Sequence, residues 1–420
     1  MSPTLIQLVA AAIFGLALVH TFSTRYFERL AHTQPAHAGA WHLLAEVEIV
    51  FGFWAMVMMV VMAALLGQGE ALAYLDTRNF TEPLFVFAIM VVAGSRPVLQ
   101  AASVVVQAIA RLIPLPRTLA FFFTALAIVP LLGSFITEPA AMTLAALLMK
   151  DTIFARASNR LKYAALGALF VNISIGGTLT PYAAPPVLMV AKAWGFDLAY
   201  MLTHIGWKAA LAVFINALAL TLLFGRELRA IESSSESPYS GVPLWMVGVH
   251  LLFLIGIVLF AHHPAAFIAV FLLFMGIASA YPYYQDKRLM LREGLLVAFF
   301  LGGLVVLGGL QQWWLQPLLL AMDETQVYFG SIALTAITDN AALTYLGSLV
   351  EGLSPEFKYA LVTGAVTGGG LTLIANAPNP AGAAILKSSF PDGAIAAHGL
   401  LMGALGPTLV AILCFRLFPL

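Results

Sequence analysis

The sequence predicts an all-α polytopic membrane protein built from two inverted repeats, each with a re-entrant hairpin and a broken transmembrane helix. Composition is the first observation, because 61% of the 420 residues are hydrophobic and only 10% are charged, whereas a soluble domain carries about 25% charge. The second observation is that two sequence motifs each occur twice. The third is the distribution of charged residues among the loops. Since a span needs about 20 apolar residues, we expect about 10 spanning helices plus 2 hairpins.

The duplicated motifs divide the chain into two related halves. Residues 137–143 read TEPAAMT, and residues 338–344 read TDNAALT. A glycine-rich stretch follows each copy: residues 176–186 read GGTLTPYAAPP, and residues 368–378 read GGGLTLIANAP. Because both pairs keep the same order and similar spacing, they indicate an internal duplication with a carboxylate in the apolar part of each half.

The first half begins with an apolar helix at 4–22, which no cleavage signal follows, so we expect it to be retained. Helices are predicted at 43–66 and from Pro83, the latter interrupted at 94–97. The apolar segment 118–149 has basic residues on both flanks, and basic loops stay cytoplasmic. It must therefore enter and return, and at this length it is predicted to be a hairpin rather than two spans.

The rest of the chain completes this plan and repeats it. A helix at 163–191 is expected to break in its middle, and a helix at 203–224 leads to a polar linker. The second half is predicted to contain helices 243–260, 264–280 and 294–310, a hairpin at 325–350, a broken helix at 359–386 and a last helix at 395–418. The resulting parts are an N-terminal accessory helix and cytoplasmic loop (1–42), repeat 1 (43–225), a cytoplasmic linker (226–242), an accessory helix (243–263) and repeat 2 (264–420).

The loop charges give the two hairpins opposite orientations. Acidic residues flank the second hairpin, among them Asp323, Glu324 and Glu351, so its ends are expected outside, whereas the first hairpin opens from the cytoplasm. Both termini are then external. Inverted repeats with broken helices are typical of secondary transporters that hold substrate near the membrane midplane.

Asp339 is the strongest candidate site residue. A carboxylate at the bilayer centre costs roughly 2.5–3.5 kcal/mol, so it is a functional candidate by default. The alternative is a capping Asp that accepts backbone N–H groups at the hairpin tip. Because removal from water disfavours its charged form, such an acid holds either a proton or a metal cation. Mutually exclusive binding of Na⁺ and a proton at Asp339 would suffice for cation/proton antiport.

Further ligands are predicted around both hairpin tips. Glu138 is the symmetric acid, and its alternative role is an ion pair with Arg96, which lies inside the third helix. Hard cations take carboxylate, amide and carbonyl oxygens. Threonine hydroxyls are weaker candidates because they commonly bond their own helix. The other expected ligands are Thr137, Thr180, Thr338, Asn340, Thr372, Asn376 and Asn379. The predicted helix breaks lie at Gly176, Gly177, Pro181, Gly368, Gly369, Gly370 and Pro378.

Other chemistry finds no support in the sequence. We see no phosphate loop, no nucleophile with a paired base and no zinc pattern, so neither an enzyme nor a cofactor is expected. Zero net charge gives no case for a nucleic-acid partner. Glu46 and Glu48, near the start of helix 43–66, are interpreted as interfacial residues.

An Asp-Asn hairpin tip followed by Gly-Gly-x-x-Thr-x-x-Ala-Asn, from Gly368 to Asn376, resembles the ion transporter superfamily of arsenite permeases, dicarboxylate carriers and sodium/proton antiporters. Over residues 43–420 the chain is most similar to a bacterial sodium/proton antiporter family. The resemblance implies a homodimer in the bacterial inner membrane, with a scaffold part and a moving part, that transports Na⁺ and H⁺. It also implies that Asp339, Asn340 and Asn376 belong to the site. Pro139 and Ala184 depart from the pattern at the symmetric positions.

Two other functions remain open. An organic-anion (dicarboxylate) or arsenite carrier on the same fold would need positive potential from Arg96 or from helix N-termini. The acids at both hairpin tips favour a cation instead. A channel is the weaker third alternative.

Overall fold

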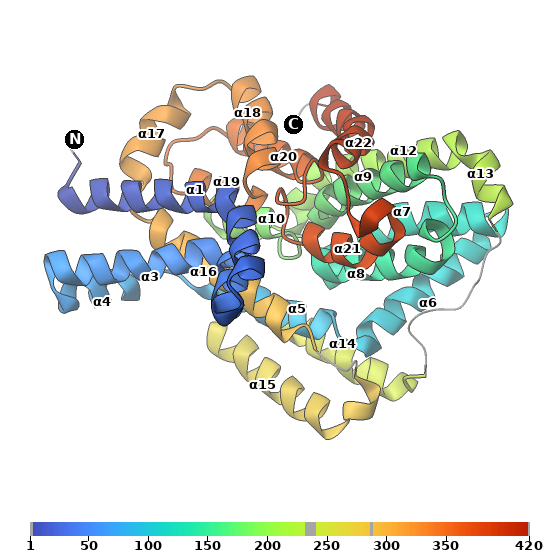
Figure 1. Ribbon diagram of the computed structural model, residues 1–420, viewed down its shortest axis with the longest axis horizontal. Coiled ribbons are helices and arrows are strands. Elements are labelled where there is room, and N and C mark those ends of the chain that lie inside the picture. The colour runs from blue at the N-terminus through green and yellow to red at the C-terminus, as the bar shows by residue number, and fades with distance from the viewer. Residues whose placement is uncertain (1–2, 232–240, 286–288, 419–420) are drawn as a thin grey trace.

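The computed structural model describes residues 3–231, 241–285 and 289–418, and this part of the chain is helical with no strand. Figure 1 shows the arrangement. Six of its helices are long and apolar enough to cross a membrane, or seven if one bent pair counts as a single span.

The first half contains α1 (Leu5–Thr33), α2 (Ala38–Leu44), α3 (Val47–Leu66), α4 (Gln68–Asp76), α5 (Thr81–Ala93), α6 (Arg96–Leu112), α7 (Arg117–Ile136), α8 (Glu138–Met149), α9 (Asn159–Gly176), α10 (Pro185–Trp194), α11 (Leu198–Tyr200), α12 (Trp207–Leu223) and α13 (Gly225–Ala230). The second half contains α14 (Leu244–Leu259), α15 (Pro264–Ala280), α16 (Leu291–Gly308), α17 (Gln312–Leu320), α18 (Glu324–Ile337), α19 (Asn340–Ser348), α20 (Pro355–Gly368), α21 (Asn379–Leu386) and α22 (Ala397–Leu417).

The N-terminal elements differ from their predicted bounds. Helix α1 continues past the expected end at Phe22 to Thr33, because neither proline nor glycine occurs between Phe22 and Pro35. The helix expected at 43–66 is divided, since α2 ends at Leu44 and Glu46 has extended backbone before α3. Helices α4 and α17 lie in stretches where no helix was predicted, and α13 lies largely in the predicted linker.

Two helical hairpins contain the duplicated acids. Helices α7 and α8 pack against each other, and Thr137 between them has φ 72°, a left-handed conformation found at no other non-glycine residue in the described ranges. In the second hairpin α18 ends at Ile337 and α19 begins at Asn340. The sequence patterns that predicted hairpin tips at Glu138 and Asp339 therefore coincide with breaks between helices.

Three further interruptions divide long apolar segments. The third apolar segment bends by 67° between α5 and α6, at the Gly-Ser-Arg-Pro sequence that predicted a break. Helix α9 ends at Gly176, and the chain returns to helix at Pro185. Helix α20 ends at Gly368, and α21 begins only at Asn379. Both of these gaps contain the glycine-rich motifs.

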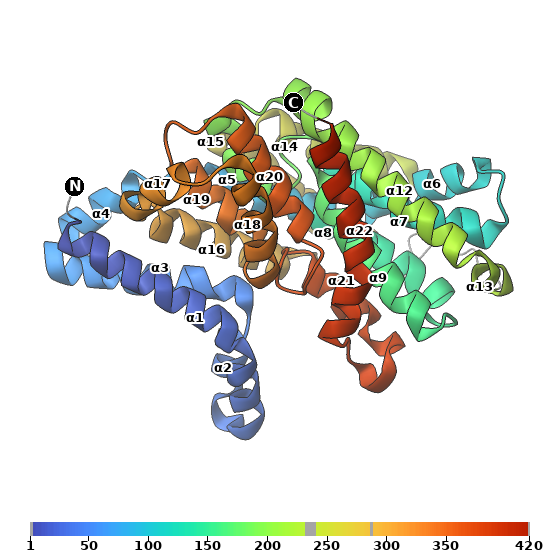
Figure 2. The same cartoon turned by 90° about the horizontal axis from the view of Figure 1, so that it is seen from above.

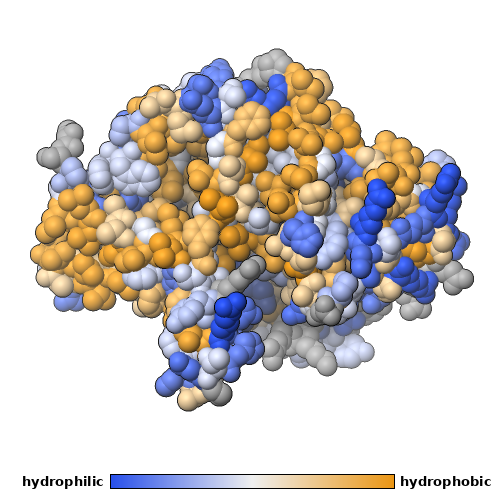
Figure 3. Space-filling view, turned by 45° about the horizontal axis from the view of Figure 1, so that its top comes forward, coloured by the Kyte–Doolittle hydropathy of each residue, from blue (hydrophilic) through white to orange (hydrophobic). Residues whose placement is uncertain are grey.

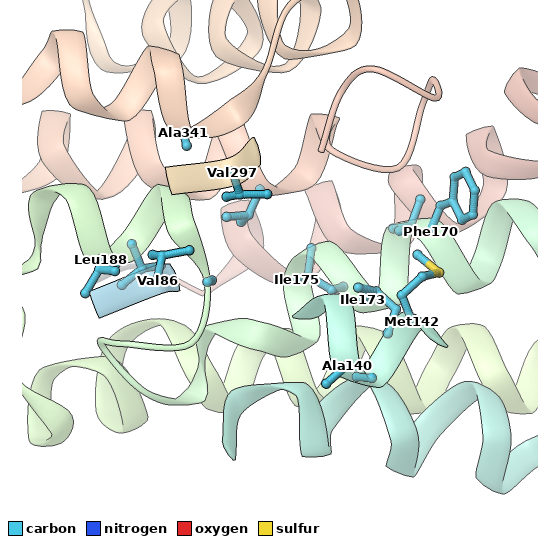
Figure 4. Close-up of a cluster of buried hydrophobic side chains, with 14 of the residues drawn as sticks. Val86, Ala140, Met142, Phe170, Ile173, Ile175, Leu188, Val297 and Ala341 are labelled. Carbon is cyan, nitrogen blue, oxygen red and sulfur yellow. The ribbon is translucent and has the colours of Figure 1, made fainter. Parts of the chain in front are cut away.

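Each hairpin packs against a helix that belongs to the other half of the chain. Helix α8 of the first hairpin packs against α21, which follows the second break. Helix α19 of the second hairpin packs against α10, which follows the first break. Figure 4 shows the apolar side chains of this region, with Ala140 and Met142 near Ile173, and Ala341 above Val297. The two halves are therefore interlocked around one core.

The helices form two neighbouring bundles, which we name for later use. The peripheral bundle comprises α1, α3, α5, α14, α15 and α16, and the central bundle comprises α7 to α10, α12 and α18 to α22. Figures 1 and 2 show α1, α3 and α4 at one end of the molecule and α7, α12 and α13 at the other. Helices α16 and α19 are in contact where the bundles meet.

The outer surface is apolar over wide areas (Figure 3). Large side chains such as Val60, Leu222, Leu252 and Met402 are each about 70% exposed. Soluble monomers rarely expose extended apolar patches, whereas lipid solvates such side chains. The fold is therefore that of a polytopic membrane protein.

Candidate cation site at the hairpin tips

Asp339 is buried at the tip of the second hairpin, with 7% of its surface exposed. Its Oδ1 accepts hydrogen bonds from the backbone N–H groups of Ala341 at 2.8 Å and Ala342 at 3.2 Å, so it caps α19. The capping role weighed from the sequence is therefore present. In the part of the chain that the structure describes, both hydrogen bonds fall on Oδ1, so capping leaves Oδ2 available to a cation.

Glu138 is fully buried at the tip of the first hairpin. Its Oε2 accepts a hydrogen bond of 2.8 Å from Nδ2 of Asn376, which lies in the break of the other half. The structure thus gives Glu138 a different partner from the Arg96 suggested by the sequence. The Arg96 guanidinium lies beside Gly241, within 3.9 Å of where a Cβ of that residue would be.

Asn376 connects the two hairpin tips. It donates to Glu138, and it lines a small cavity together with Asp339. The carboxylates of Glu138 and Asp339 are close enough to repel each other. Two acids on either side of one amide, in a buried place, create a demand for positive charge that a proton or a metal cation would meet.

The second break is tied to the second hairpin by asparagines. The backbone N–H of Asn340 donates to the carbonyl of Ala375 at 3.2 Å, and its side chain donates to Oγ of Ser174 at 3.4 Å. Asn379 donates from Nδ2 to the carbonyls of Gly369 and Thr372, at 2.7 and 2.8 Å. The amide nitrogen of Asn379 thus holds the backbone of the break, whereas those of Asn340 and Asn376 donate to side chains. In all three asparagines the side-chain oxygen is left for another partner.

Five predicted ligands contain a buried oxygen that has no hydrogen-bond partner among the residues described. These atoms are Thr137 Oγ1, Glu138 Oε1, Asn340 Oδ1, Asn376 Oδ1 and Asn379 Oδ1. Native proteins leave few buried polar atoms unpaired, and each calls for an explanation such as a bound ion or water. Their concentration around the hairpin tips makes this region the best candidate for a cation site.

Thr180 and Thr372, at corresponding places in the two glycine-rich motifs, make matched hydrogen bonds. Thr180 Oγ1 donates to the carbonyl of Ser134 at 2.6 Å, and Thr372 Oγ1 donates to the carbonyl of Ala336 at 2.8 Å. Each threonine therefore bonds the break to the end of the first helix of the hairpin, α7 for Thr180 and α18 for Thr372, rather than to its own helix. The expected local bond is made by Thr178 and by Thr338, whose hydroxyl donates to Leu334 at 2.7 Å.

The motif glycines allow close approach. A Cβ on Gly177 would lie 2.6 Å from Oε1 of Glu138, and a Cβ on Gly176 would lie 2.8 Å from the carbonyl of Pro130. A Cβ on Gly368 would likewise lie 2.6 Å from the carbonyl oxygen of Ile332. Gly369 abuts Ser174 and Gly370 abuts Val171. None of the motif glycines has a positive φ, so close packing rather than a left-handed turn requires them.

The predicted prolines take different places. Pro378 precedes α21 as its N-cap residue. Pro181 lines a separate cavity of about 510 Å³ together with Glu82 and Lys192, so it does not face the cavity at Asp339.

Glu48, expected at the membrane interface, lies instead beside Asp339. It lies in the first turn of α3 and lines the same cavity as Asp339 and Asn376, with a volume of about 30 Å³. Its carboxylate is close enough to repel that of Asp339. The sequence feature that could have identified Glu48 is its position directly before a long apolar run. Unlike Glu138 and Asp339, however, Glu48 has no duplicated counterpart in the other half.

Comparison with known proteins gives one family. A model described as "Putative Na+/H+ antiporter" matches residues 5–418. No curated protein matches the sequence significantly. Because the family match covers nearly the whole chain and agrees with the resemblance found in the motifs, the chain belongs to the "Putative Na+/H+ antiporter" family.

Proposed function

We propose that this protein exchanges Na⁺ for H⁺ across the membrane, with the two ions competing for Asp339 at the tip of the second hairpin. The observation that carries the proposal is the group of buried, unpartnered oxygens at the hairpin tips. Carboxylate, amide and hydroxyl oxygens are the ligands of hard cations, and a buried carboxylate without a cation is relieved by a proton instead.

The arrangement of the two halves supports alternating access. Each hairpin packs on the helix that follows the other half's break, and matched threonines fasten matched breaks. We infer that these are inverted repeats around a site near the membrane midplane, as in other secondary transporters. The five-part division of the chain belongs to the same proposal, although residues 232–240 of the linker lie outside the described ranges. The proposal also includes a homodimer and a location in the bacterial inner membrane, with both termini external.

The described residues around Asp339 favour a cation over an anion. The cavity at Asp339 is otherwise lined by Glu48, Asn376 and apolar residues, and Glu138 is hydrogen-bonded to Asn376 beside it. An anionic substrate would be repelled there, so cation exchange remains the function that the geometry supports.

The test is proton flux in proteoliposomes with an acidic lumen and a pH-sensitive dye. Adding external sodium, lithium or potassium chloride should make the lumen of wild-type vesicles more alkaline. Asp339→Asn should abolish this response, because asparagine keeps the helix cap but cannot exchange a proton. The matched control is Asp323→Asn, since Asp323 caps α18 in the same way at an exposed position.

Each outcome has a clear meaning. Exchange that survives in Asp339→Asn would contradict the role of this carboxylate. If correctly inserted wild-type protein responds to none of the three cations, the antiport proposal is wrong, and uptake of labelled dicarboxylate or arsenite becomes the next measurement.

A further inference from the structure

Glu48 reaches the candidate site from the other bundle. It stands in the first turn of α3, in the peripheral bundle, whereas Asp339 and Asn376 belong to the central bundle. All three line one cavity of about 30 Å³, which Val297 and Phe300 of α16 complete on the peripheral side. A cavity of about 10–15 Å³ already holds one water, so this space suits a single water or cation.

The charges around Glu48 leave the cavity short of positive charge. Glu48 interacts electrostatically with Glu46, the N-cap residue of α3, with Arg292 at the start of α16 and with Asp339, which lines the same cavity. Arg292 forms an ion pair with Glu46 at the rim, and 66% of its side chain is exposed. Arg292 is thus paired with Glu46 and is not among the residues that line the cavity, whereas the two carboxylates of Glu48 and Asp339 are.

Asn376 supplies independent evidence that this cavity takes a ligand. Only 1% of its surface is exposed. Its Nδ2 is occupied by Glu138, whereas its Oδ1 has no partner among the residues described. This acceptor oxygen needs a cation, a water or a protonated carboxyl group as its partner, and a cation in the cavity would satisfy it together with both carboxylates.

We propose that Glu48 is a second carboxylate ligand of the transported cation, which it shares with Asp339 and with Oδ1 of Asn376. This inference rests on the proposed cation transport. A cation held this way joins the peripheral bundle to the tip of the second hairpin. Loss of the cation, or its replacement by a proton on one acid, releases that link. Occupancy of the site would then govern whether the two bundles stay together at this cavity.

The first test measures how much sodium gives half-maximal exchange. Glu48→Gln should raise this concentration by about ten-fold or more, because cation affinity in oxygen-lined sites depends on ligand charge. Glu48→Asp keeps the charge on a shorter side chain and should retain part of the affinity. Glu293→Gln is the matched control, since Glu293 is an exposed acid next to Arg292 that does not line the cavity. A lower maximal rate with unchanged half-saturation in Glu48→Gln would overturn the proposal.

The second test does not depend on transport. Ala377 lines the cavity, and Cys414 is the sole cysteine of the chain, so Ala377→Cys is made together with Cys414→Ala. Sodium, but not choline, should slow alkylation of the new thiol by a small maleimide. With Glu48→Gln added, the same protection should need about ten-fold more sodium.

The two tests separate the proposals. Protection that is equal with and without Glu48 overturns the role of this residue while leaving antiport intact. Vesicles without any exchange overturn the antiport proposal, and sodium protection that depends on Glu48 would still support the ligand. Absence of protection in the protein that retains Glu48 contradicts a cation site in this cavity.

Discussion

At the scale of single residues, Asp339 and Asp323 show how one side chain serves two purposes. Both cap the N-terminus of a helix by accepting backbone N–H groups. Asp323 is exposed, whereas Asp339 is buried next to two other acids. Capping is therefore common to both, and burial beside like charges distinguishes the candidate cation ligand.

Gly177 offers a residue-scale prediction about the first hairpin. Gly177→Ala places a methyl group against the buried Glu138 carboxylate, and overpacking of this kind typically costs about 1–3 kcal/mol. We expect a lower melting temperature in detergent and reduced sodium-dependent exchange.

Gly276→Ala is the control for this substitution, because a Cβ at Gly276 of α15 meets open space. Its melting temperature should be unchanged or higher, since alanine favours helix over glycine by up to about 1 kcal/mol. Equal stability of the two variants would show that Glu138 does not need the close approach at Gly177.

At the scale of elements, the sequence predicted breaks better than helix lengths. Prolines and glycines end helices for local steric reasons, so the breaks at 94–97, after Gly176 and after Gly368 were visible. Helices α4 and α17 were missed because each has only 9 residues and so lacks the long apolar run of a membrane span. The threonine bonds from Thr180 and Thr372 were missed as well, because their partners lie on another element that local reasoning does not see.

The opposite orientation of the two hairpins is testable at this scale. In a Cys414→Ala background, single cysteines are placed at exposed flanks of the first hairpin, Arg117→Cys and Asn159→Cys, and of the second, Glu324→Cys and Glu351→Cys. A membrane-impermeant maleimide applied to intact bacterial cells should label only the second pair, because basic flanks stay inside. The first pair should react after the cells are permeabilised. Labelling of both pairs from the same side would contradict inverted hairpins.

At the scale of the whole molecule, side chains from one half make hydrogen bonds to the other half. Glu138 from the first hairpin is held by Asn376 of the second half, and Ser174 of α9 donates to Val366 of α20 at 2.7 Å. The duplicated acids and the three candidate asparagines could be picked out from the sequence, because each interrupts an apolar run. Glu48 was not, because only the packing of α3 and α16 beside the second hairpin brings it to the cavity.

The central claim is that sodium and a proton exclude each other at Asp339, and the most direct measurement is proton release on sodium binding. Sodium chloride is added to purified protein in weakly buffered detergent solution, with choline chloride as the control. Because a cation ligand must lose its proton to bind the ion, the account predicts release of about one proton per site from wild type and none from Asp339→Asn. Sodium binding without proton release, or equal release from the two proteins, would contradict it.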